Sequence, residues 1–113
     1  MRRMRPVWIY LLFGSVFIRP QRGIPAIYVG ITSNPALRSR NHFEGRSGLP
    51  PGFIPEQFVP VIEIATRKLG YVVESALAQA LRQRLTTCVV LGGFLSRQLD
   101  RYKIASPNPL GAQ

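Results

Sequence analysis

The single histidine of the chain, His42, lies four residues after Arg38 and fourteen after Tyr28. Residues four apart share one face of a helix, so Arg38 and His42 should lie side by side if this segment is helical. An arginine matches phosphate oxygens in bidentate fashion, and a histidine can bind phosphate or relay a proton near neutral pH. The spacing therefore leaves two interpretations open, a phosphate-handling site or a strand that leads into a basic surface helix.

Local signals predict the helix that would carry these two residues. Ser33 or Asn34 can cap its first turn by accepting hydrogen bonds from free N–H groups, and Pro35 suits the first helical position. The helix is expected to continue to about Phe43 or Glu44, followed by a loop rich in glycine and proline over residues 45–56.

Three strands are predicted around this helix. An apolar run at 7–13, with a possible extension to residue 18, and a second run at 26–31 predict a hairpin joined by turn residues 19–25. The third strand is expected at 58–66, where Pro60 indicates an edge position or a bulge.

The clearest helical pattern covers residues 70–85 and carries Glu74. A short apolar run follows at 88–91, a last short helix is expected at 95–102, and the final residues form a tail. The spacing of the long helix predicts one buried face, formed by Val73, Ala76, Leu77, Ala80, Leu81 and Arg84.

The length of the chain limits the number of domains, and its net charge limits the classes of partner. A chain of 113 residues predicts one domain over 1–113, and a net charge of +10 predicts a polyanionic partner. DNA or another nucleic acid is favoured over an anionic membrane or an acidic protein, and a solvated basic surface without function stays open. No membrane association is expected.

Cys88 is the only cysteine, which excludes a disulfide framework and a cysteine-based zinc site and favours a reducing, cytoplasmic location. Its apolar neighbours predict a buried, inert thiol. The basic residues at 1–6 followed by an apolar run at 7–18 resemble a secretory signal, which leaves an exported basic protein as an alternative. The run is too short to span a bilayer as a helix, no cleavage site follows, and its composition favours a strand.

An ordered set of residues along the chain resembles the GIY-YIG nuclease family. Trp8-Ile9-Tyr10 resembles the first family motif, and Tyr28-Val29-Gly30 resembles the second. Arg38 stands at the place of the family arginine, His42 follows one helical turn later, and Glu74 matches the glutamate of the family's second helix. The resemblance covers about residues 7–93, with residues 94–113 as a C-terminal helix and tail.

The resemblance implies a compact α/β (α+β) domain with a small, three-stranded, mostly antiparallel sheet flanked by helices. Its order would be strand, strand, helix, strand, helix, with one more helix possible. It implies a metal-dependent endonuclease that hydrolyses phosphodiester bonds in DNA with Mg²⁺ or Mn²⁺.

The resemblance also implies roles for individual residues. Tyr10 would act as general base, which requires cationic neighbours because a free tyrosine has a pKa near ~10, and Tyr28 would position the nucleophile or the phosphate. Arg38 would hold the scissile phosphate, His42 would relay a proton or bind phosphate, and Glu74 would anchor the metal. Arg40 and Arg46 are expected to contact nucleic acid, and a targeting protein supplied in trans could provide specificity.

Other interpretations stay open from the residues alone. Tyr10 and Tyr28 could be half-buried strand aromatics, and Arg38 a solvated arginine. His42 could be a surface or helix-end histidine, and Glu74 a surface partner of Lys68 or Arg82. Trp8 replaces the glycine of the first motif, and residues 89–93 lack the asparagine that many members place after the second helix. A catalytically weak or inactive relative that only binds nucleic acid is therefore the second hypothesis.

Overall fold

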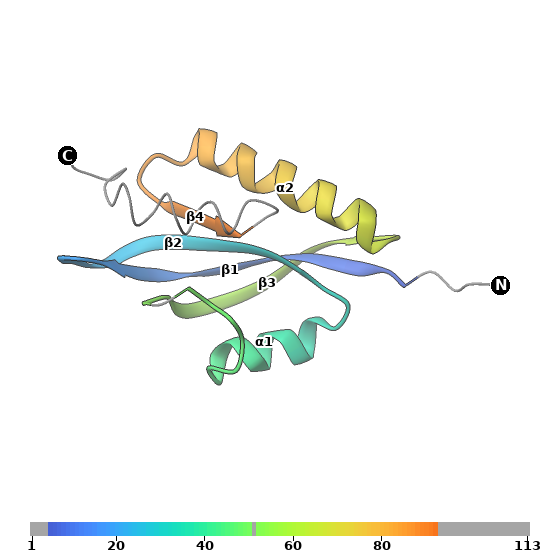
Figure 1. Cartoon of the computed structure of the whole chain (residues 1–113), viewed down its shortest axis with the longest axis horizontal. Coiled ribbons are helices and arrows are strands. Elements are labelled where there is room, and N and C mark those ends of the chain that lie inside the picture. The colour runs from blue at the N-terminus through green and yellow to red at the C-terminus, as the bar shows by residue number, and fades with distance from the viewer. Residues whose placement is uncertain (1–4, 51, 93–113) are drawn as a thin grey trace.

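The computed structural model of the chain describes residues 5–50 and 52–92. These residues form a four-stranded mixed sheet in the order β3-β1-β2-β4, with helix α1 on one face and helix α2 on the other (Figure 1). The elements in chain order are β1 (Val7–Ile18), β2 (Gln21–Thr32), α1 (Pro35–Phe43), β3 (Ile54–Ile64), α2 (Arg67–Arg84) and β4 (Val89–Gly92). The α+β class is confirmed, whereas the predicted count of three strands is wrong because β4 adds a fourth.

Strands β1 and β2 form a longer hairpin than the sequence predicts. Antiparallel pairing extends to Ile18 and Gln21, so only Arg19 and Pro20 form the turn. The predicted turn at 19–25 is wrong because pairing with β1 extends the strand through Gly23, at a φ of 70°, and Pro25. Pro25 lies opposite Ser15, just outside the part of β2 that pairs with β4.

Strand β3 lies at an edge of the sheet, as Pro60 indicates. Its pairing with β1 shifts register between Ile9 and Tyr10, and Pro60 stands opposite Tyr10 at this irregularity. The strand covers 54–64 instead of the predicted 58–66. It ends earlier because Thr66 caps α2, with its Oγ1 accepting a hydrogen bond from the N–H of Leu69 at 3.2 Å.

The short run after α2 is a strand that the sequence did not predict. β4 pairs with β2 in parallel, with Val89 opposite Ala26. The guanidinium of Arg82 fixes it to α2 by donating from Nε to the Val90 carbonyl and from Nη2 to the Gly92 carbonyl, both at 3.1 Å. Arg82 therefore serves the fold, and its partial burial lowers its pKa.

Helix α2 packs on the sheet through a stripe of residues spaced by four. Gly70, Glu74 and Ala78 are its buried residues. A Cβ on Gly70 would lie 2.7 Å from Cγ2 of Val7, so glycine permits this close approach. The predicted face is only partly correct: Val73, Leu77 and Leu81 pack beside the stripe, whereas Ala76, Ala80 and Arg84 do not belong to the buried face.

Alternation along the strands builds a separate apolar cluster on each face of the sheet. Under α2 lie Val7, Ile9, Ile27, Val29, Ile64, Ala78 and Val90. On the α1 face lie Tyr10, Leu12, Val16, Ile24, Ala26, Phe53 and Leu91. Because β1 lies inside the sheet and supplies residues to both clusters, the apolar run at 7–18 is part of the folded domain.

The expected helix at 95–102 and the tail after it lie outside the described residues. Within the described part of the chain, neither helix combines the length and hydropathy that a membrane crossing requires.

Candidate active site

A buried hydrogen bond joins the first predicted tyrosine to the histidine. The Tyr10 hydroxyl on β1 lies 2.8 Å from Nε2 of His42 on α1, across 32 positions of sequence. Tyr10 is 1% exposed and His42 is 3% exposed. The interpretation of His42 as a surface histidine is therefore wrong, and the pair has the geometry of a proton-transfer contact.

The glycine of the Tyr-Val-Gly motif makes room for the Tyr10 ring. Tyr10 and Gly30 stand opposite each other in the β1–β2 register. A Cβ on Gly30 would lie 2.4 Å from the Tyr10 ring and hydroxyl, so a side chain here would displace the tyrosine. Phe58 of β3 stacks on the same ring with a centroid distance of 4.6 Å. The ring is thus held by all three antiparallel strands.

The start of α1 aims His42 at this ring. Asn34 Oδ1 accepts a hydrogen bond from the N–H of Leu37 at 3.1 Å, which confirms the predicted cap. Thr32 Oγ1, at the end of β2, accepts from the N–H of Asn34 at 3.1 Å and ties the strand end to the helix start. These two local bonds set the direction in which the helix leaves the sheet.

The second nitrogen of His42 also has a partner. Its Nδ1 lies 2.6 Å from Oγ of Ser47, in the loop after α1. The sequence prediction missed Ser47. A signal was nevertheless available, because Gly45 just after the helix is typical of a helix end that reverses the chain.

Tyr28 completes a group of aromatic rings around this hydrogen bond. Its ring centroid lies 6.4 Å from that of Tyr10 and 5.9 Å from that of His42. Unlike Tyr10, which is buried, Tyr28 is only half-buried. The structure therefore brings both motif tyrosines and His42 together, with Tyr28 at the more accessible side.

The surroundings of Tyr10 favour its neutral form. Burial raises the pKa of the phenol above its usual value, and the nearby Tyr28 and Glu74 act in the same direction. Arg38 lowers the pKa of Tyr10 but is outweighed. The phenolate expected from cationic neighbours is therefore not the resting form, and the hydroxyl can donate a hydrogen bond to His42.

The surroundings of His42 also favour its neutral form. Burial, followed by the positive charge of Arg38, lowers the pKa of His42 to about 4. At neutral pH the ring therefore carries one N–H and one lone pair, and it can accept a proton at only one of its two nitrogens.

The arginines of this region differ in exposure. Arg38 is half-buried, and its charge acts on both Tyr10 and His42, as their pKa values indicate. Arg40 and Arg46 are exposed, and Arg46 forms a surface ion pair with Glu44. Only Arg38 therefore lies at the hydrogen-bonded pair, while the other two face solvent nearby.

Glu74 lies on α2, which packs on the other face of the sheet from α1. It is 7% exposed, which argues against a surface ion pair with Lys68, and the guanidinium of Arg82 donates instead to backbone carbonyls. The charge of Glu74 raises the pKa of Tyr10, so the carboxylate lies within electrostatic reach of the tyrosine. The structure thus groups Tyr10, Tyr28, Arg38 and His42 on the α1 side of the sheet, whereas α2 carries Glu74 on the other face, from which its charge acts on Tyr10.

The described residues include one buried carboxylate near the tyrosines, that of Glu74, as a possible metal ligand. Among the described residues no three His, Cys, Asp or Glu side chains lie close enough together to hold a metal. A typical zinc site needs three or four such side chains, so these residues do not offer one. A single carboxylate such as Glu74 fits Mg²⁺ or Mn²⁺, since Mg²⁺ keeps several waters and takes further oxygens from a phosphate.

Cys88 stays outside this neighbourhood. It packs beside the cluster under α2, and burial raises the pKa of its thiol. A raised pKa lowers the thiolate fraction, which supports the prediction of an inert cysteine.

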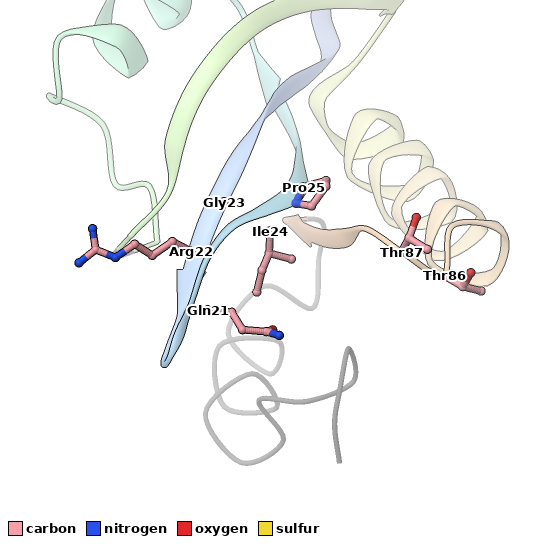
Figure 2. Close-up of a pocket in the computed structure, with 7 residues that line it drawn as sticks. All are labelled: Gln21, Arg22, Gly23, Ile24, Pro25, Thr86 and Thr87. Carbon is pink, nitrogen blue, oxygen red and sulfur yellow. The ribbon is translucent and has the colours of Figure 1, made fainter.

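An open hollow of about 550 Å³ lies near the hairpin turn. Figure 2 shows Gln21 and Ile24 near the start of β2, with Thr86 and Thr87 from the loop after α2, while Arg22 points away from those threonines. None of its lining residues belongs to the predicted site.

Comparisons of the chain with protein-family models, with curated proteins and with solved structures found no match. The functional interpretation therefore depends on the geometry described above and on the motif resemblance in the sequence.

Proposed function

We propose that the protein is a metal-dependent endonuclease that hydrolyses phosphodiester bonds in DNA. The observation that carries this proposal is the buried hydrogen bond between Tyr10 and neutral His42, with Arg38 and Glu74 within electrostatic reach. A purely structural hydrogen bond would not require a positive and a negative side chain that both act on the charge state of Tyr10.

In the proposed reaction the oxygen of a water attacks phosphorus while the bond to the leaving sugar oxygen breaks. The attacking water gives a proton to the Tyr10 oxygen as Tyr10 passes its own proton to Nε2 of His42. The leaving oxygen takes a proton from solvent water. Tyr28, on the accessible side, orients the water or the phosphate.

Arg38 has two functions in this scheme. It binds the scissile phosphate through its guanidinium. Burial is the larger cause of the low pKa of His42, and the positive charge of Arg38 adds to it; phosphate binding would offset the Arg38 contribution and make His42 a stronger base. The resting site is therefore a weak base, and substrate binding activates it.

Glu74 would hold the metal ion, Mg²⁺ or Mn²⁺, through its single carboxylate. When bound, the ion supplies positive charge against the phosphate oxygens. Glu74 is carried on α2, whose buried stripe packs on the sheet, so its carboxylate is fixed relative to Tyr10.

Binding to DNA would use the basic surface outside the site. The net charge of +10 predicts salt-dependent, sequence-tolerant binding through phosphates. Arg40 and Arg46 are exposed near Arg38 and can extend the contact along the backbone. Sequence or shape specificity would come from the loop at 45–53 or from a targeting protein in trans.

The test is a cleavage assay on duplex, branched and single-stranded DNA with Mg²⁺ or Mn²⁺. Glu74→Gln keeps side-chain size and removes the charge, and Arg38→Ala removes the phosphate ligand. We expect each variant to lose about 100-fold or more in cleavage rate, as for other removals of transition-state charge stabilisation.

Two exposed residues provide matched controls. Glu63→Gln on β3 makes the same chemical change as Glu74→Gln, and Arg84→Ala at the end of α2 makes the same charge change as Arg38→Ala. Both controls should cleave within about twofold of the wild type. Equal losses in Arg38→Ala and Arg84→Ala would instead indicate a general effect of charge on binding.

A binding module without cleavage is the second candidate, and one observation favours it. Tyr10 is 1% exposed, so a water must enter a closed site before it can meet the hydroxyl. The same assay separates the two functions: salt-dependent binding without cleavage on any of the three DNA shapes would exclude the nuclease.

A further inference from the structure

Ser47 is the hydrogen-bond partner of the second ring nitrogen of His42, and such a partner influences which nitrogen carries the proton. Its Oγ is 2.6 Å from Nδ1, while Nε2 faces the Tyr10 hydroxyl at 2.8 Å. The three side chains therefore form a chain of two hydrogen bonds, from Tyr10 through the imidazole to Ser47. Nothing in the motif resemblance assigns a role to Ser47.

The end of α1 places Ser47 there. Gly45 follows the helix with a φ of 74°, a backbone conformation that favours glycine. Its N–H donates to the His42 carbonyl at 3.3 Å, and the N–H of Arg46 donates to the Asn41 carbonyl at 2.8 Å. This pair of bonds is the Schellman arrangement, which turns the chain back along the helix. The reversal returns Ser47 to the ring of His42.

The two tautomers of neutral His42 have opposite consequences. If Nδ1 carries the proton, it donates to Ser47 Oγ and leaves a lone pair on Nε2 for the Tyr10 hydroxyl. If Nε2 carries the proton, Ser47 must donate to Nδ1, and Nε2 donates to the Tyr10 oxygen. In that second form His42 cannot accept the tyrosine proton.

We infer that Ser47 is a positioning residue that holds His42 as the Nδ1–H tautomer, so that Nε2 accepts the proton of Tyr10. The catalytic consequence rests on the proposed nuclease function, whereas the tautomer is a property of the free protein. Ser47 touches no reacting atom. It acts through His42, as the partner of the second ring nitrogen does in other histidine sites.

The charged and titratable groups around His42 agree with this role. Arg38 on α1 opposes a second proton on the ring, and burial acts in the same direction. On the strands, Tyr10 and Tyr28 face the ring, and the carboxylate of Glu74 on α2 is within electrostatic reach of Tyr10. The remaining choice between two neutral tautomers is then left to the partners of the two nitrogens.

A spectroscopic test reads the tautomer directly because His42 is the only histidine of the chain. Protein labelled with ¹⁵N-histidine and free of affinity-tag histidines is measured by long-range ¹H–¹⁵N correlation at neutral pH. The wild type should show a protonated Nδ1 and an unprotonated Nε2. Ser47→Ala should shift the ring toward a mixture or the Nε2–H form, and Ser47→Thr, which keeps an Oγ, should restore the wild-type spectrum.

Cleavage measured across pH supplies the second readout. Ser47→Ala should lower the cleavage rate about tenfold, less than the 10²–10⁴-fold expected for loss of a whole acid–base group. Ser47→Thr should recover most of it, and circular dichroism should show that both variants fold. A wild-type Nε2–H tautomer, or a tautomer unchanged in folded Ser47→Ala, would overturn the inference. Absence of cleavage with the expected tautomer shift would overturn only the proposed nuclease function.

Discussion

The two faces of the sheet are built from the same alternating strands but bury different chemistry. Under α2 the buried side chains of the strands are all aliphatic, with Phe13 partly buried beside them, and an 18-residue helix covers them. The other face is covered by a loop and by the nine-residue helix α1. This helix places His42 against Tyr10 and the neighbouring aromatic rings. One face therefore supplies apolar burial, and the other holds a polar network that must be satisfied internally.

The difference teaches where polar groups can be buried at low cost. On the α1 face the Tyr10 hydroxyl and both His42 nitrogens find partners, so their desolvation is compensated. Glu74 is the one charged residue in the buried stripe of α2. Burying a charge costs free energy unless it is paired, so this carboxylate is the exception on an otherwise apolar face.

Ile9 and Tyr10 allow the sharpest comparison, since they are adjacent in β1 and fully buried on opposite faces. Ile9→Ala should lower the free energy of unfolding by about 4 kcal/mol through lost burial and a cavity. Tyr10→Phe keeps the ring and should cost about 1 kcal/mol, for one hydrogen bond. Urea denaturation measures both. A smaller cost for Ile9→Ala than for Tyr10→Phe would contradict the division between the two faces.

Acid should destabilise the α1 face selectively. The pKa of His42 is about 4 in the folded protein and 6.5 as its ordinary value, so the unfolded chain binds the proton first as pH falls. His42 should therefore stabilise the fold fully above pH 6.5 and lose that contribution, about 3 kcal/mol, as pH falls from 6.5 to 4.

Denaturation midpoints measured at intervals across this range test the acid prediction. His42→Gln should flatten the slope between pH 6.5 and 4, whereas Ile9→Ala should keep it at lower overall stability. A slope that persists in His42→Gln would assign the effect to the carboxylates instead.

At the alkaline end the raised pKa of Tyr10 predicts a separate loss of stability as pH rises above the usual range of a phenol.

Gly30→Ala should disturb the site while leaving the aliphatic face intact. The added Cβ would lie 2.4 Å from the Tyr10 ring, so we expect a cost of about 2 kcal/mol and a changed His42 spectrum. Gly48→Ala is the control, because nothing lies within 4 Å of its Cβ position. An unchanged His42 spectrum in Gly30→Ala would show that the glycine does not hold the ring in place.

Local signals predicted the site helix well. Asn34 as the cap, Pro35 at the first position and an end at Phe43 all agree with the structure. These features depend on bonds within a few residues, so the sequence contains the information needed. The edge position of β3 was predictable for a similar reason, since Pro60 lacks an N–H and suits an irregular edge strand.

Features set by distant pairing were predicted poorly. β4 has four residues and becomes a strand only by lying parallel to β2. The turn chemistry at 19–25 was overridden because β1 offered a continuous partner as far as Ile18. On α2 the predicted face was displaced because small residues, Gly70 and Ala78, let the helix approach the sheet along their own stripe.

The sequence by itself determined which residues carry reactive groups, where α1 begins and ends, and that the chain is strongly basic. Only the tertiary structure decided that Tyr10 meets His42, that Gly30 lies beneath the tyrosine ring, and that Ser47 returns to the second imidazole nitrogen. Helix caps and charge are local or additive properties. A hydrogen bond between groups 32 residues apart depends instead on strand register and on the direction of the helix, which form only when the chain packs.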